Sequence, residues 1–135
     1  MKSIALLVLV LTLGLHGLFA QESTLYVGTI PLQEIDSDYL EVETVFLAPL
    51  AAEQYFSVQY GQDCLNRPVR FLTRNFLESC SGLKDESGEL ISAYHYAEML
   101  TLLRRHGWDL VQVLLENSDG DSSTTSSAKF LLRRM

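Results

Sequence analysis

Residues 92 to 116 read SAYHYAEMLTLLRRHGWDLVQVLLE, and this stretch decides the fold. Its first half predicts a helix, because apolar residues recur at the three-and-four spacing of one buried helical stripe. The residues of that stripe are Tyr96, Ala97, Met99, Leu100 and Leu103. Ser92 is placed to cap the start of the helix, since a serine oxygen accepts hydrogen bonds from free backbone N–H groups of the first turn. Gly107 is placed to end it, because glycine readily adopts the left-handed conformation that closes a helix.

The residues after this glycine, DLVQVLLE, predict a strand over 109–116, because the run is short, apolar and rich in β-branched residues. Apolar side chains occur at both parities of the strand, so both of its faces carry them. The two sets are Trp108, Leu110 and Leu114, and Val111, Val113 and Leu115. A sheet covered by a helix on one face alone shows a cleaner alternation. We therefore expect the N-terminal segment or another copy of the chain to cover the second face.

Three further strands are expected. Residues 39–50 and 54–62 both alternate between apolar and polar side chains, and the short connection between them predicts an antiparallel hairpin. A polar loop then separates the strand at 109–116 from KFLLRRM, residues 129–135, which predicts a final strand. The expected order is strand, strand, helix, strand, strand, which is an α+β domain. Residues 63–90 predict an irregular insertion before the helix.

The first twenty residues have the layout of a secretory signal peptide: Lys2, an apolar run from Ile4 to Leu13, and the small Ala20 before a polar stretch. We expect cleavage there, an N-terminal arm over 21–38, and a single domain over 39–135. The exported chain is then periplasmic or secreted and has no membrane span. Its formal net charge of −7 before cleavage argues against nucleic acid as a partner.

Cys64 and Cys80 are the two cysteines of the chain. Cysteines in an exported protein are more often joined than free, so we expect a structural disulfide, with two unpaired buried thiols as the alternative. No CxxC redox motif is present, and two cysteines alone cannot form a closed zinc site.

The sequence offers little catalytic chemistry. Beyond the first twenty residues the histidines are His95 and His106, at opposite ends of the predicted helix and about 16 Å apart by helical rise, so they cannot act together. Neither glycine-rich phosphate loop is present. We expect no catalytic residues, no metal and no cofactor, and a protein that is not an enzyme.

Aromatic residues give the one candidate ligand site. Tyr55, Tyr60, Tyr94 and Tyr96, with Trp108, either line a groove for a peptide or glycan or close a small core. The ligand-binding candidates within this set are Tyr94 and Tyr60, to which the neighbouring His95 is added.

The runs MLTLLRRHGWDLVQVLL (99–115) and KFLLRRM (129–135) resemble a family of small bacterial domains of unknown function. The family signature is a leucine-bearing helix, then Gly-Trp-Glu-Leu-Val or Gly-Trp-Glu-Phe-Val, then a terminal strand ending in Lys or Arg. The segments FSVQYGQ and DESGELIS resemble exported members from Bacteroidetes. The resemblance covers residues 39–135, with the Cys64 to Cys80 segment as an insertion and Asp109 in place of Glu. It implies a four-stranded antiparallel sheet with one packed helix, and no activity.

Two functional hypotheses follow. The first is a non-enzymatic module of the cell envelope that binds a protein or glycan partner, or forms a homo-oligomer through a sheet face. The doubly apolar strand at 109–116 motivates it. The second is a small ligand-binding protein or hydrolase with a site around Tyr94, His95 and the Cys64 to Cys80 segment, which predicts a concave pocket there.

Overall fold

The computed structural model describes residues 22–48, 52–66, 73–116 and 127–135. The expected signal peptide at 1–20 lies outside the described residues, as does most of the polar loop before the last strand.

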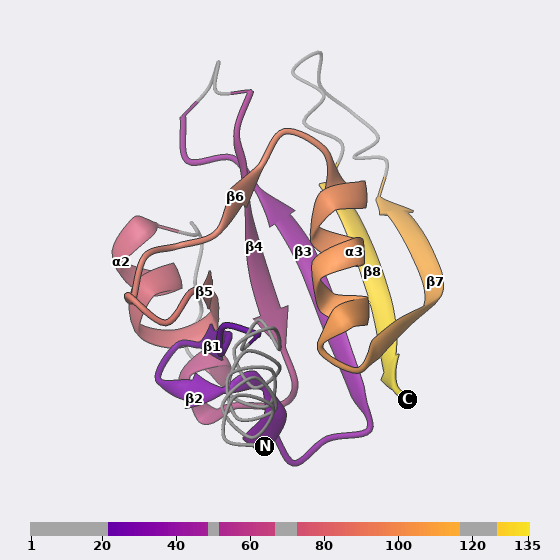
Figure 1. The fold of residues 1–135 in the computed structure, drawn as a ribbon. Helices are drawn as coiled ribbons and strands as arrows, with labels where there is room; N and C mark the ends of the chain where they lie inside the picture. Colours follow the sequence, from indigo (N-terminus) through magenta and orange to yellow (C-terminus); the bar gives the residue numbers. More distant parts are fainter. Residues whose placement is uncertain (1–21, 49–51, 67–72, 117–126) are drawn as a thin grey trace, which may run out of the picture.

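A five-stranded antiparallel sheet forms the centre of the molecule (Figure 1). Its spatial order is β6-β4-β3-β8-β7. The strands are β3 (Tyr39–Val45), β4 (Gln54–Gln59), β6 (Ser92–Ala93), β7 (Trp108–Glu116) and β8 (Ser127–Arg134). The predicted β3–β4 hairpin is confirmed, with Val42 opposite Val58 and Thr44 opposite Phe56. Strand β8, which comes after β7 in the sequence, lies between β3 and β7.

Helix α3 (Tyr96–Arg105) lies across one face of this sheet, in front of β3 and β8 in the view of Figure 1. Met99 and Leu103 of its apolar stripe are buried in the core. The helix ends as predicted at Gly107, which has a φ of 88° and donates its N–H to the carbonyl of Arg104. The start of the helix differs from the prediction, because Ser92 belongs to strand β6 and its hydroxyl donates to Glu53 instead of accepting from N–H groups of the first turn. His95 occupies the N-cap position without a side-chain cap.

A second, three-stranded sheet lies beside β4 and has the order β2-β1-β5. Its strands are β1 (Tyr26–Val27), β2 (Ile30–Pro31) and β5 (Leu83–Lys84). The β1–β2 turn requires glycine: Gly28 has a φ of 60°, and a Cβ there would lie 2.6 Å from the carbonyl oxygen of Cys80. The residues expected as an N-terminal arm, 21–38, thus supply β1, β2 and the 3₁₀ turn η1 (Leu32–Glu34).

The segment expected as an irregular insertion contains four short elements. They are η2 (Asp63–Asn66), α2 (Arg74–Phe76), the π-helical turn η3 (Leu77–Ser81) and β5. This segment attaches to β4 through a bridge between Ser57 and Gly82 and through a buried hydroxyl pair, in which Ser57 donates to Ser81 at 2.8 Å.

The expected fold class, a four-stranded sheet with one packed helix, is therefore wrong. The chain forms two sheets, of five and three strands, with two short α-helices among the described residues. The prediction failed because β1, β2, β5 and β6 are two residues long, and so short a strand has no periodicity from which it can be recognised.

One core unites the two sheets and α3. Its largest fully buried side chains are Trp108, Phe56 and Phe130. Trp108 follows the helix stop directly, and the guanidinium of Arg134 lies 4.7 Å from its ring centroid, opposite it across the β7–β8 pair. Arg134 also donates to the backbone carbonyl of Ile35 and, at 3.2 Å, to that of Ser37. The Arg134 guanidinium therefore joins β8 to Trp108 and to the segment before β3.

We predict that Arg134→Met will lower the free energy of unfolding by about 2 kcal/mol, because methionine keeps an unbranched stem but loses the charged donors and the cation–π contact. Arg133→Met is the matched control, since Arg133 is exposed and neighbours the same strand end. Urea unfolding of both variants is the measurement. Equal losses in the two variants would contradict a specific role for Arg134.

Candidate interaction site

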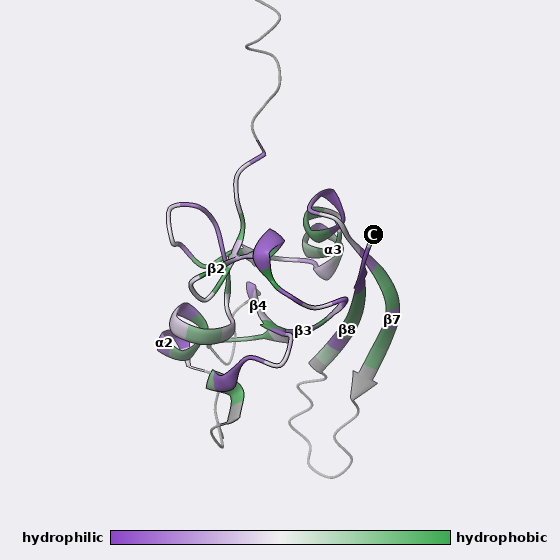
Figure 2. Cartoon of the chain, turned by 90° about the horizontal axis from the view of Figure 1, so that it is seen from below, coloured by the Kyte–Doolittle hydropathy of each residue, from purple (hydrophilic) through white to green (hydrophobic). Residues whose placement is uncertain are grey.

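Strand β7 is an outer strand of the five-stranded sheet and pairs with β8 alone. Among the described residues no strand pairs with its other side, so its outward backbone N–H and C=O groups form an open edge. The strand is nine residues long, the longest described. Figure 2 shows β7 at the margin of the molecule, with hydrophobic residues along it.

Four side chains of β7 are apolar and exposed, and they lie on both faces of the sheet. Leu110, Val111, Val113 and Leu114 have 38%, 51%, 45% and 42% of their surface exposed, respectively. Val113 lies opposite the buried Phe130 and therefore on the core face, whereas Leu114 lies opposite Lys129 and therefore on the other face. The prediction that both faces of this strand carry apolar groups is confirmed, and helix α3 leaves both of them accessible. The predicted division of the residues is wrong, because a shift in register places Leu110 and Val113 together on the core face and Leu114 on the other. We call Leu110 to Leu114 and the open backbone edge beside them the β7 edge.

An irregularity interrupts the β7 edge near its start. The pairing with β8 shifts between Leu110 and Gln112, leaving Val111 as an extra residue. Such a bulge disturbs further pairing where it occurs. The register is regular from Gln112 to Glu116.

The start of α3 packs against the core residue that lies opposite Val113. The Tyr96 ring lies 5.4 Å from the ring of Phe130, which in turn is opposite Val113. Tyr96 is half exposed. Phe130 is itself buried, so Tyr96 and Val113 are two exposed apolar positions that share one buried neighbour.

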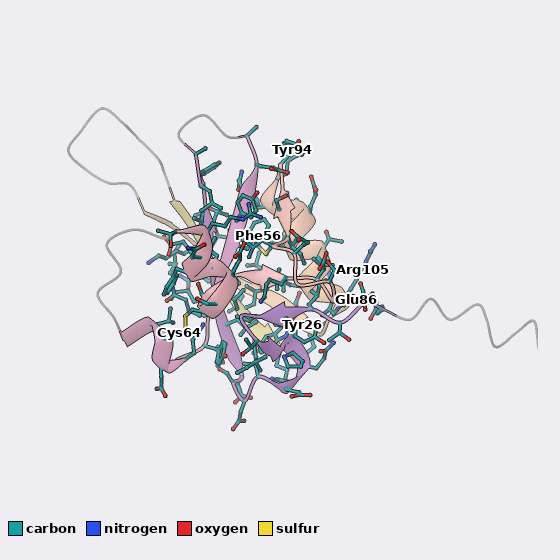
Figure 3. All side chains as sticks on the ribbon, turned by 90° about the vertical axis from the view of Figure 1, so that its left-hand side faces the viewer. Tyr26, Phe56, Cys64, Glu86, Tyr94 and Arg105 are labelled. Atoms are coloured by element: carbon teal, nitrogen blue, oxygen red, sulfur yellow. A yellow bond between two sulfur atoms is a disulfide. The ribbon has the colours of Figure 1, made fainter. Side chains whose placement is uncertain are left out.

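A separate apolar groove of about 500 Å³ lies on the other side of α3. Phe56 and Met99 contribute buried side chains to it, and Ile91 to Ala93 line it opposite the helix. Figure 3 places Phe56 in the middle of the molecule beside α3. The polar side chains Ser92 and Thr101 are already engaged, with Glu53 and the carbonyl of Ala97. No sequence pattern predicted this groove, because Ser92 was expected to cap the helix and not to line a groove beside it.

The three predicted ligand-binding residues are not brought together. Tyr94 is 60% exposed, and its carbonyl accepts from Gln54 at the start of β4. His95 is exposed beside it, whereas Tyr60 follows the far end of β4, about 20 Å away by strand rise. Partial burial raises the pKa of the Tyr60 hydroxyl. None of the three lines the groove described above.

Cys64 and Cys80 form a disulfide that joins η2 to η3, with a Cα–Cα distance of 6.0 Å, and the predicted pairing is confirmed. Figure 3 shows Cys64 low in the molecule and Tyr94 near its top, so the disulfide and Tyr94 lie far apart.

The histidines have separate surroundings. His106, at the end of α3, has one ring nitrogen 2.9 Å from the carbonyl oxygen of Leu102 and the other 3.0 Å from that of Ser23. It thereby links the helix end to the residues before β1. Within the described ranges, no group of three or more metal-ligating side chains is found. No described helix combines the length and apolar character needed to cross a bilayer.

Comparison with protein-family models, with curated proteins and with solved structures finds no match. The resemblance to small bacterial domains of unknown function stays a prediction.

We predict that Cys64→Ser/Cys80→Ser will lower the free energy of unfolding by about 3 kcal/mol, because the disulfide closes a loop with a sequence separation of 16. Guanidinium unfolding with and without a thiol reductant is the measurement. The reductant should destabilise the wild-type protein by a similar amount and leave the double variant unchanged. Identical unfolding midpoints for oxidised wild-type protein and the variant would contradict the prediction.

Proposed function

We propose that this chain is a non-enzymatic interaction module, exported to the cell envelope or beyond, and that the β7 edge is its binding element. The observation that carries the proposal is the exposure of four apolar side chains within five residues, Leu110, Val111, Val113 and Leu114, on a strand with an open edge. Exposed contiguous apolar surface on a folded domain typically marks a site of protein interaction.

The open backbone edge indicates the mode of recognition. An extended segment of a partner can add to β7 as a further strand, with main-chain hydrogen bonds providing affinity and side-chain contacts providing specificity. Proteins usually protect a long edge with charges, proline or a covering element. From Leu110 to Leu115 the strand has no charge and no proline, and the bulge at Val111 affects only its first part.

The disulfide supports the exported location. Disulfides persist in oxidising compartments such as the periplasm and the extracellular space, and they are rare in the cytosol. The Cys64–Cys80 pair and the signal-like first twenty residues agree in this respect.

We predict that peptides selected by display against the immobilised protein will have alternating apolar residues and will require the β7 edge. Val113→Lys/Leu114→Lys should reduce their binding at least about tenfold, because a lysine on each face of the strand opposes the apolar contacts of an added strand. Fluorescence polarisation with the selected peptides measures the loss.

Ile30→Lys is the matched control, because Ile30 is exposed to a similar extent, 39%, but belongs to β2 in the other sheet. It should bind the peptides as the wild-type protein does. Selected peptides that bind the double variant and the wild-type protein equally well would reject the β7 edge as the binding element.

A further inference from the structure

We infer that the partner of the β7 edge is a second copy of this chain, whose own β7 pairs antiparallel with the first across a two-fold axis. This inference rests on the proposed function and makes it specific. The product is a continuous ten-stranded sheet formed by the five-stranded sheets of two copies.

The exposure of both faces favours a strand with the same pattern. Val113 on the core face and Leu114 on the opposite face need apolar neighbours on both sides of the sheet at once. A ligand or helix lying on one face would cover only one of them. A strand that is itself apolar at both parities covers both, and β7 has this pattern.

The charges near the edge also favour self-pairing. The chain has a formal net charge of −7, yet residues 110–115, LVQVLL, carry no charge. Like charges placed directly opposite each other destabilise a strand pair. Two copies of this segment can pair without such a contact. The flanking Asp109 is within 3.7 Å of Arg104 of its own chain.

The bulge is compatible with a two-fold arrangement. Residues 110–116 have their midpoint at Val113, so pairing centred there places the Val111 bulges of the two copies at opposite ends of the paired segment. The regular residues from Gln112 onward lie near the axis. Closed dimers with two-fold symmetry are the commonest oligomers of soluble proteins.

The interface is small. A seven-residue strand pair falls toward the low end of specific protein interfaces. We therefore expect reversible, concentration-dependent dimerisation rather than a permanent dimer.

A charge exchange at Val113 tests the inference. In any antiparallel register that shifts this midpoint by no more than one residue, two copies of position 113 lie within about 8 Å of each other, which is within the screening length at physiological salt. Val113→Lys and Val113→Glu should each weaken dimerisation at least about tenfold in analytical ultracentrifugation, because each places like charges together. An equimolar mixture of the two variants should dimerise again, and more strongly at low salt.

Ile30→Lys should dimerise as the wild-type protein does. Association through the N-terminal segment, which all variants share, would persist equally in Ile30→Lys and in both Val113 variants. Recovery in the mixture shows that each variant is folded. A wild-type protein that stays monomeric, variants that dimerise as the wild type does, or a mixture that does not recover would each overturn the inference. A monomeric wild-type protein whose β7 edge still binds displayed peptides would leave the proposed function standing, whereas loss of both would reject both.

Discussion

The contact between Trp108 and Arg134 holds the architecture together. Trp108 begins β7 directly after the helix stop, is almost completely buried and is the largest side chain of the core. Arg134 lies over its ring and donates to carbonyls of the segment that leads into β3. The end of the helix, the start of β7, the end of β8 and the approach to β3 therefore meet at one pair of side chains. The N–H of Met135, which donates to the carbonyl of Gly107, strengthens the same junction.

The two edges of the five-stranded sheet differ in how far other parts of the chain cover them. At one edge, β4 is covered by the short strand β6 and by the bridge from Ser57 to Gly82, and the segment that supplies this bridge is fastened by the disulfide. At the other edge, β7 extends for nine residues with apolar side chains on both faces, and no described strand pairs with its outer side. Aggregation is the usual consequence of an edge of this kind unless a specific partner occupies it. Because the long β7 side is left open among the described strands, it is the edge at which a partner strand can be added.

The sequence predicted the elements that have a clear period or a clear stop. Gly107 ended the helix where expected, and the doubly apolar strand after it was placed correctly, because both signals lie within a few adjacent residues. The small sheet could not be predicted, since each of its strands depends on partners more than fifty residues away or on a two-residue turn. Ser92 shows the same limitation: a serine before a helical stripe has the pattern of a cap, but its hydroxyl is engaged by Glu53, almost forty residues earlier. Tyr94 and Tyr60 are both tyrosines that the sequence could assign to one site. In the structure they lie at opposite ends of β4.

The order of the strands also determines when the fold can be completed. Strand β8 lies in the interior of the five-stranded sheet, between β3 and β7, although β3 is synthesised some ninety residues earlier. Until residues 127–134 have been made, β3 and β7 have no strand between them, and the edges that pair with β8 stay unpaired. Pairings so distant in sequence form slowly, because the closure of a long loop must precede them. The five-stranded sheet can therefore be completed only after the last strand of the chain has been made, so nearly the whole chain must be present before its central sheet can form.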